Sequence, residues 1–60
     1  MPDQKLRSLA REARERAGEA LTLAETFRDA EARRIMREVA ENYEKLAERL
    51  EQHACDLRKV

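Results

Sequence analysis

Apolar residues recur every seven positions through the second half of this chain. Three rows with that spacing lie between residues 30 and 60: Met36, Tyr43, Leu50 and Leu57; Val39, Leu46, His53 and Val60; and Ala40, Ala47 and Ala54. A seven-residue repeat places neighbouring rows along one stripe of a long α-helix. The constraint is strong, because such a stripe must be covered by another helix.

The first half of the chain carries the same three-row pattern. Its rows are Leu6, Ala13, Ala20 and Phe27; Leu9, Arg16 and Leu23; and Ala10, Ala17 and Ala24. Each half therefore contains one row made only of alanine. Small side chains in one row let two backbones approach closely, which favours tight antiparallel packing of the two halves.

The phase of the two patterns favours a hairpin over one unbroken helix. Continuing the Phe27 row would reach Arg34 and Glu41, whereas the apolar row actually restarts at Met36. This slip of two residues turns the stripe by about 200° on a continuous helix. The sequence predicts helices at about 3–27 and 30–58 and a turn at about 28–30, with a single helix over 3–58 as the alternative.

The boundary between the helices has two readings. Asp29 is suited to cap the second helix, with Glu31 in its first turn near the positive end of the helix dipole. Thr26 and Asp29 also match a capping box, which would place the boundary a few residues earlier. Neither glycine nor proline marks the turn.

Composition and charge limit the function classes. The chain has 60 residues, 43% of them charged, with a net charge of zero. The balance argues against a dedicated nucleic-acid or membrane-surface binder. No apolar run or signal-peptide core indicates a membrane or an export route. The lone Cys55 cannot form an internal disulfide, so we expect a cytoplasmic protein.

A chain this short rarely buries enough surface on folding to be stable alone. We therefore expect an all-α antiparallel two-helix hairpin, one domain over residues 1–60, that dimerises into a four-helix bundle. A helical protein partner is the other way to cover the stripe. The residues predicted to form this interface are Leu6, Leu9, Phe27, Met36, Val39, Tyr43, Leu46, Leu50, His53 and Leu57.

No catalytic, metal or cofactor site is predicted. His53 has Arg49 and Leu57 one turn away, and neither is a metal ligand or an orienting carboxylate. The Glu-x-x-His spacing of di-metal bundles fails because Leu50 precedes His53 at that distance. We expect a non-enzymatic structural or interaction module, with His53 at the edge of the interface and Cys55 as an exposed thiol.

A small nucleic-acid-binding regulator is the alternative function. Its contacts would be the arginine cluster at the start of the second helix, formed by Arg28, Arg33, Arg34 and Arg37. No exposed aromatic residue is expected beside the cluster for base stacking. Pairing of these arginines with neighbouring acids is the simpler interpretation.

One stretch also resembles known proteins. The residues Asp29-Ala30-Glu31-Ala32-Arg33-Arg34-Ile35-Met36, followed by Ala40, Tyr43, Leu46-Ala47 and Glu51, resemble a group of short uncharacterised proteobacterial proteins with a D-P-E-x-R-R-x-M pattern. The resemblance covers about residues 20–51 and departs at Ala30, where proline is common. It implies a helical hairpin and brings no activity or functional residue.

In plan and size the chain is also similar to the repressor-of-primer family, whose hairpins dimerise into four-helix bundles and bind paired RNA loops. That similarity is architectural, and the RNA-contacting motif of the family is not recognisable in this sequence. Similarity at the level of a fold does not establish a function.

Overall fold

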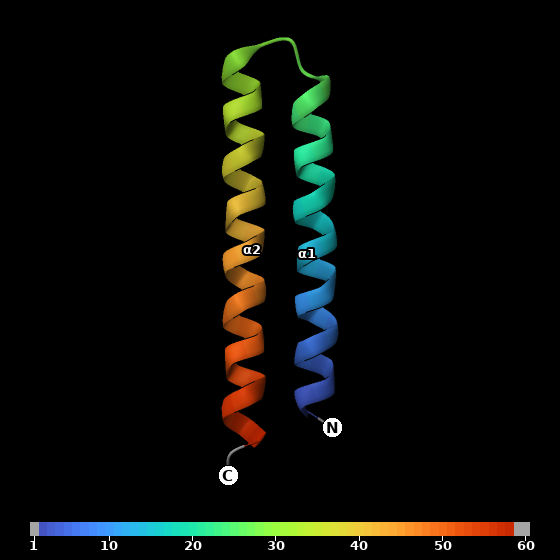
Figure 1. The fold of residues 1–60 in the computed structure, drawn as a ribbon, viewed down its shortest axis with the longest axis vertical. Helices are drawn as coiled ribbons and strands as arrows, with labels where there is room; N and C mark the ends of the chain where they lie inside the picture. Colours follow the sequence, from blue (N-terminus) through green and yellow to red (C-terminus); the bar gives the residue numbers. More distant parts are fainter. Residues whose placement is uncertain (1, 59–60) are drawn as a thin grey trace.

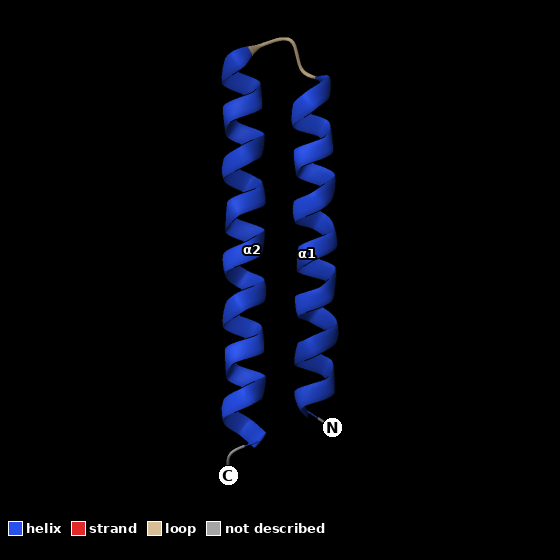
Figure 2. Cartoon of the chain, in the orientation of Figure 1, coloured by secondary structure: helices blue, strands red, loops and turns tan. Residues whose placement is uncertain are grey.

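Two long helices, packed side by side and antiparallel, make up the described structure. The computed structural model describes residues 2–58, so the predicted row position Val60 lies outside it. Helix α1 spans Pro2–Thr26 and helix α2 spans Ala30–Arg58 (Figures 1 and 2). The hairpin is 49 Å long and only 13 by 9 Å across. The hairpin prediction is confirmed, and the single unbroken helix is wrong.

Asp29 is the last residue of the turn and caps the N-terminus of α2, as the sequence predicts. Its carboxylate accepts hydrogen bonds from the backbone N–H groups of Glu31 and Ala32, each at 3.3 Å. Its carbonyl accepts the first intrahelical bond, from the N–H of Arg33 at 3.1 Å. These bonds satisfy donors that a helix start leaves without partners.

The alternative boundary at Thr26 is wrong. Thr26 is the last residue of α1, and its hydroxyl donates to the carbonyl of Leu23 at 2.7 Å instead of capping a new helix. The N–H of Phe27 then donates to the carbonyl of Ala24 at 3.3 Å and tightens the last turn. Helix α1 therefore stops one residue before the predicted end, and residues 27–29 form the whole connection.

Alanine fills the seam between the helices. Among the residues whose burial the structure describes, 3–58, the buried side chains are all alanines: Ala10, Ala13, Ala17, Ala20 and Ala24 from α1, and Ala40, Ala47 and Ala54 from α2. The seam therefore contains both alanine rows, plus the two alanines of the row that starts at Leu6. Because the side chains are small, the helix axes are expected near the lower end of the ~8–10 Å range for packed helices.

Larger residues of α2 pack against the small residues of α1. Tyr43 and Leu50 lie on the cluster of Ala10, Ala13 and Ala47. Met36, Val39 and Tyr43 lie on a second cluster, which contains Ala17, Ala20 and Ala40. The two helices are therefore complementary in size along the seam, with large residues on one helix meeting small ones on the other.

Enlarging an alanine of the seam should destabilise the hairpin. Ala47 has no exposed surface, so the change Ala47→Leu must push the helices apart or force strained side chains, at a cost of about 1–3 kcal/mol. Chemical denaturation should show this loss. The control Lys45→Leu, at an exposed position of α2, should change the stability by less than about 0.5 kcal/mol. Equal losses of stability in the two variants would contradict the close packing of Ala47 in the seam.

Gly18 should be a site where stability can be gained. It lies in the middle of α1, and a Cβ atom built on it meets nothing within 4 Å. Because glycine costs more backbone entropy than alanine in a helix, Gly18→Ala should raise the free energy of unfolding by about 0.5–1 kcal/mol. A lower denaturation midpoint in this variant would show that the absence of a side chain at Gly18 has another role.

Candidate self-association surface

The two sides of the hairpin differ in chemistry. In α1 the row beside the alanines carries Leu9 and Leu23 on one side, and Arg7 and Arg14 on the other. In α2 the corresponding rows carry Val39 and Leu46, and then Glu44 and Glu51. Antiparallel packing brings like sides together. One side of the hairpin is therefore mainly apolar, interrupted in α1 by Arg16, and the opposite side is mainly charged.

We define the apolar side by six residues: Leu9, Leu23, Val39, Tyr43, Leu46 and Leu50. Three of its four leucines are far from buried, since Leu9 is 41%, Leu23 49% and Leu46 45% exposed. A lone exposed leucine is ordinary in a folded protein, but a contiguous row on one side indicates an interaction surface.

A shallow groove runs along the apolar side. One part is lined by Leu9, Ala13, Tyr43, Leu46 and Leu50, with Glu12 and Arg16 at the α1 edge. The next part is lined by Val39, Asn42, Tyr43 and Leu46. Because Tyr43 and Leu46 belong to both parts, the groove is continuous over the middle of the hairpin.

The predicted interface residues occupy two zones of this surface. Half of them are half-buried: Leu6, Met36, Val39, Tyr43 and Leu50. The other half are exposed: Leu9, Phe27, Leu46, His53 and Leu57. None of the ten is buried within the single hairpin. The structure therefore leaves open to solvent the side chains that were expected to form a bundle core.

Three large exposed apolar residues are absent from the predicted interface: Leu21, Leu23 and Ile35. Leu21 lies on the charged side, in the row of Arg7 and Arg14. Leu23 shares the row of Leu9, so the seven-residue spacing already pointed to it. Ile35 is 48% exposed and precedes Val39 by one helical turn, which places it on the same side of α2. The side of α2 on which Ile35 lies is defined relative to the alanine seam, and the seven-residue rows alone do not locate that seam.

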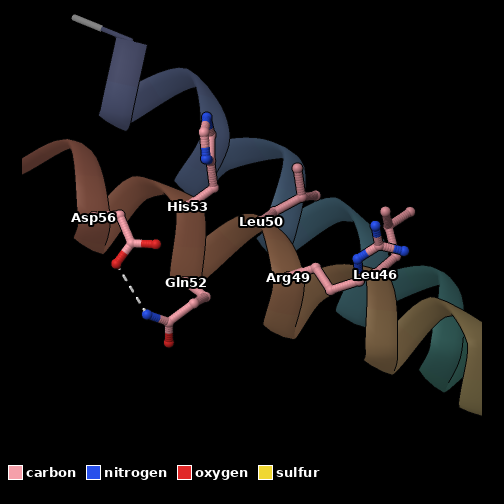
Figure 3. A pocket seen from close by; sticks show the side chains of 6 residues that line it. All are labelled: Leu46, Arg49, Leu50, Gln52, His53 and Asp56. Atoms are coloured by element: carbon pink, nitrogen blue, oxygen red, sulfur yellow. Dashed lines mark hydrogen bonds between the residues drawn. The ribbon is translucent and has the colours of Figure 1, made fainter.

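His53 lies at the end of α2 nearest the chain termini, in a depression that also includes Leu46, Leu50 and Arg49 (Figure 3). The side-chain amide of Gln52 donates to the carboxylate of Asp56 at 3.1 Å at the edge of this depression. His53 is exposed in the single hairpin. Its role at the edge of an interface stays a prediction.

Ion pairs join the helices on the charged side and at the end of the hairpin opposite the turn. Arg14 of α1 donates to the carboxylate of Glu51 in α2, and Arg58 lies 3.7 Å from Asp3. The hydrogen bond from Arg14 lowers the pKa of Glu51 below its ordinary value of 4.5. Partial desolvation opposes that shift, and the positive charges of Arg14 and Arg7 add to it. The Arg14–Glu51 pair joins the basic start of α1 to the acidic half of α2, whereas the Asp3–Arg58 pair has its acid on α1.

The arginine cluster lies around the turn. Arg28, Arg33, Arg34 and Arg37 are all exposed there, and Arg34 pairs with Glu31. Glu38 follows Arg34 by one turn, so acids are interspersed among the arginines. Phe27 is 38% exposed in the single hairpin, contrary to the expectation that no exposed aromatic lies beside the cluster.

Residues 2–58 contain no group of three or more His, Cys, Asp or Glu side chains placed to hold a metal ion. Within the same range, neither helix is long and apolar enough to cross a membrane. Cys55 is a free, exposed thiol.

Comparison with known proteins adds no assignment: no protein-family model, curated protein or solved structure matches the chain.

The Arg14–Glu51 pair should make stability depend on pH in one direction. Because the folded state lowers the pKa of Glu51, its contribution is present above about pH 4.5 and is lost as the pH falls through the lower folded value. Denaturation of wild type and Glu51→Gln at pH 7 and pH 3 should show a difference that shrinks in acid. Glu41→Gln, an exposed glutamate of the same helix, is the control. A difference that does not change with pH would contradict the pairing.

Proposed function

We propose that the chain is a non-enzymatic structural module that associates with a second copy through its apolar side and forms a four-helix bundle. The observation that carries the proposal is the group of half-exposed large apolar residues on one side of a seam built from alanine. Two such sides facing each other would bury the leucines of both copies. A homodimer also lets one surface serve both partners, as in most symmetric assemblies.

The weakness of the alanine seam supports a partner. Burying a methylene-sized group contributes about 0.8 kcal/mol, so each buried alanine adds little. Ordering each residue of the backbone costs about 1–2 kcal/mol of conformational entropy. The residues able to offset that cost are the larger apolar ones, and in the single hairpin they keep much of their surface in water.

The surface area points to a second copy as the occupant. The hairpin exposes 5012 Å², whereas a compact protein of 7.0 kDa exposes about 4,000 Å². A compact dimer of twice that mass would expose about 6,700 Å², so pairing two hairpins would bury about 3,300 Å² in total. Obligate homodimers bury roughly 2,000–5,000 Å². One additional copy is therefore of the right size to cover the excess surface.

Leu46 and Leu21 form a matched pair for testing the surface. They are almost equally exposed, at 45% and 43%, but Leu46 lies on the apolar side and Leu21 lies in the row of Arg7 and Arg14. If the apolar side is buried in a dimer, Leu46→Ala should cost about 2–5 kcal/mol per site, as for a core leucine. Leu21→Ala should cost less than about 1 kcal/mol.

Thermal melting at several protein concentrations measures both effects. The melting temperature of a dimer rises with protein concentration, and Leu46→Ala should melt below wild type at every concentration. Leu21→Ala should follow the wild-type curve closely. Equal melting curves for the two variants would contradict burial of the apolar side.

A further inference from the structure

We infer that the second copy lies with its turn at the same end as that of the first, so that α1 of each hairpin packs on α2 of the other. The inference rests on the proposed dimer and specifies its arrangement. Two symmetric arrangements bring the apolar sides together. A two-fold axis parallel to the helices keeps both turns at one end. An axis perpendicular to the helices puts the turns at opposite ends and stacks each helix on its own copy.

Contacts within the hairpin show which residues are level. Asp3 faces Arg58, and Ala47 shares one cluster with Ala10 and Ala13, so residue n of α1 is level, to within one helical turn, with about residue 61 − n of α2. Rotation about an axis parallel to the helices leaves every height unchanged. In that arrangement, a residue of α1 is therefore level with the same number in the partner's α2 as in its own.

The row just outside the apolar side decides between the arrangements. In α1 this row is Lys5, Glu12, Glu19 and Thr26; in α2 it is Ile35, Asn42, Arg49 and Asp56. These rows border the contact between hairpins, because each lies one helical turn from the residues that line the groove. All eight residues are exposed.

With the turns at the same end, the border residues are complementary. Lys5 is level with the partner's Asp56, and Glu12 is level with the partner's Arg49. By symmetry each pair occurs twice, which gives four pairs of opposite charge and none of like charge. Towards the turn, Thr26 is level with the partner's Ile35, so this exposed isoleucine would also be partly buried by the other copy.

With the turns at opposite ends, the same residues conflict. Full overlap of the two hairpins would put Glu12 beside the partner's Glu19 and the apolar Ile35 beside the partner's Asp56. Arg16, which interrupts the Leu9 and Leu23 row, would lie within one residue of the two-fold axis and face the partner's Arg16. Like charges brought together at an interface oppose association.

The charges needed for the same-end arrangement are not engaged within the hairpin. Among residues 2–58 the ion pairs are Arg14–Glu51, Glu31–Arg34 and Asp3–Arg58. Lys5, Glu12 and Arg49 take part in none of them, and Asp56 accepts a hydrogen bond only from Gln52. In the same-end arrangement Arg16 is level with the partner's Leu46, where its aliphatic stem can pack while Glu12 lies one turn away.

The distance between the two turns tests the inference directly. A spin label on Arg28→Cys, in a Cys55→Ser background, marks the turn of each copy. Because the hairpin is 49 Å long, pulsed electron resonance should give about 20 Å between labels at the same end and about 40 Å at opposite ends, using the helical rise per residue. A distance near 40 Å would overturn the arrangement and leave the dimer standing. Absence of any dipolar coupling at high concentration would overturn both.

A charge exchange provides the second test. Glu12→Arg places arginine opposite the partner's Arg49, and should raise the dissociation constant of the dimer about tenfold. Adding Arg49→Glu to the same chain should restore the constant to within about threefold of wild type. The control Glu15→Arg makes the same charge change at an exposed position outside the border row, and should leave the constant unchanged. Failure of the second substitution to rescue the first would overturn the inference.

Discussion

Close packing of alanine on alanine is the contact on which the rest of this structure depends. It brings α1 and α2 near enough for Tyr43, Leu50 and Met36 to pack across the seam. It also leaves Leu9, Leu23 and Leu46 beside the seam instead of within it. Because alanines occupy the seam, the two helices pack closely and the larger apolar residues are left beside the seam, where they form the apolar side.

Much of the fold could be predicted because its determinants are local and periodic. The carboxylate of Asp29 caps α2 through bonds to residues that follow it directly, so sequence alone could identify it. The phase slip between Phe27 and Met36 indicated the hairpin. Thr26 could not be assigned in the same way, because its hydroxyl can serve either the end of one helix or the start of the next.

Which row would be buried was harder to predict. Leu46 and Ala47 are neighbours in sequence and both belong to heptad rows, yet Ala47 has no exposed surface and Leu46 is 45% exposed. Periodicity defines a stripe but not its centre, and the centre depends on how closely the two helices approach. For the same reason the sequence alone does not assign Ile35 to the apolar side, since its place there depends on where the seam runs.

The central claim is that a second copy covers the apolar side, and the molar mass of the wild-type chain in solution tests it most directly. Sedimentation equilibrium over a wide concentration range, with reductant present to keep Cys55 free, separates the two cases. A folded species of twice the chain mass of 7.0 kDa is the predicted result. A helical protein that stays at the mass of one chain at every concentration would contradict the account.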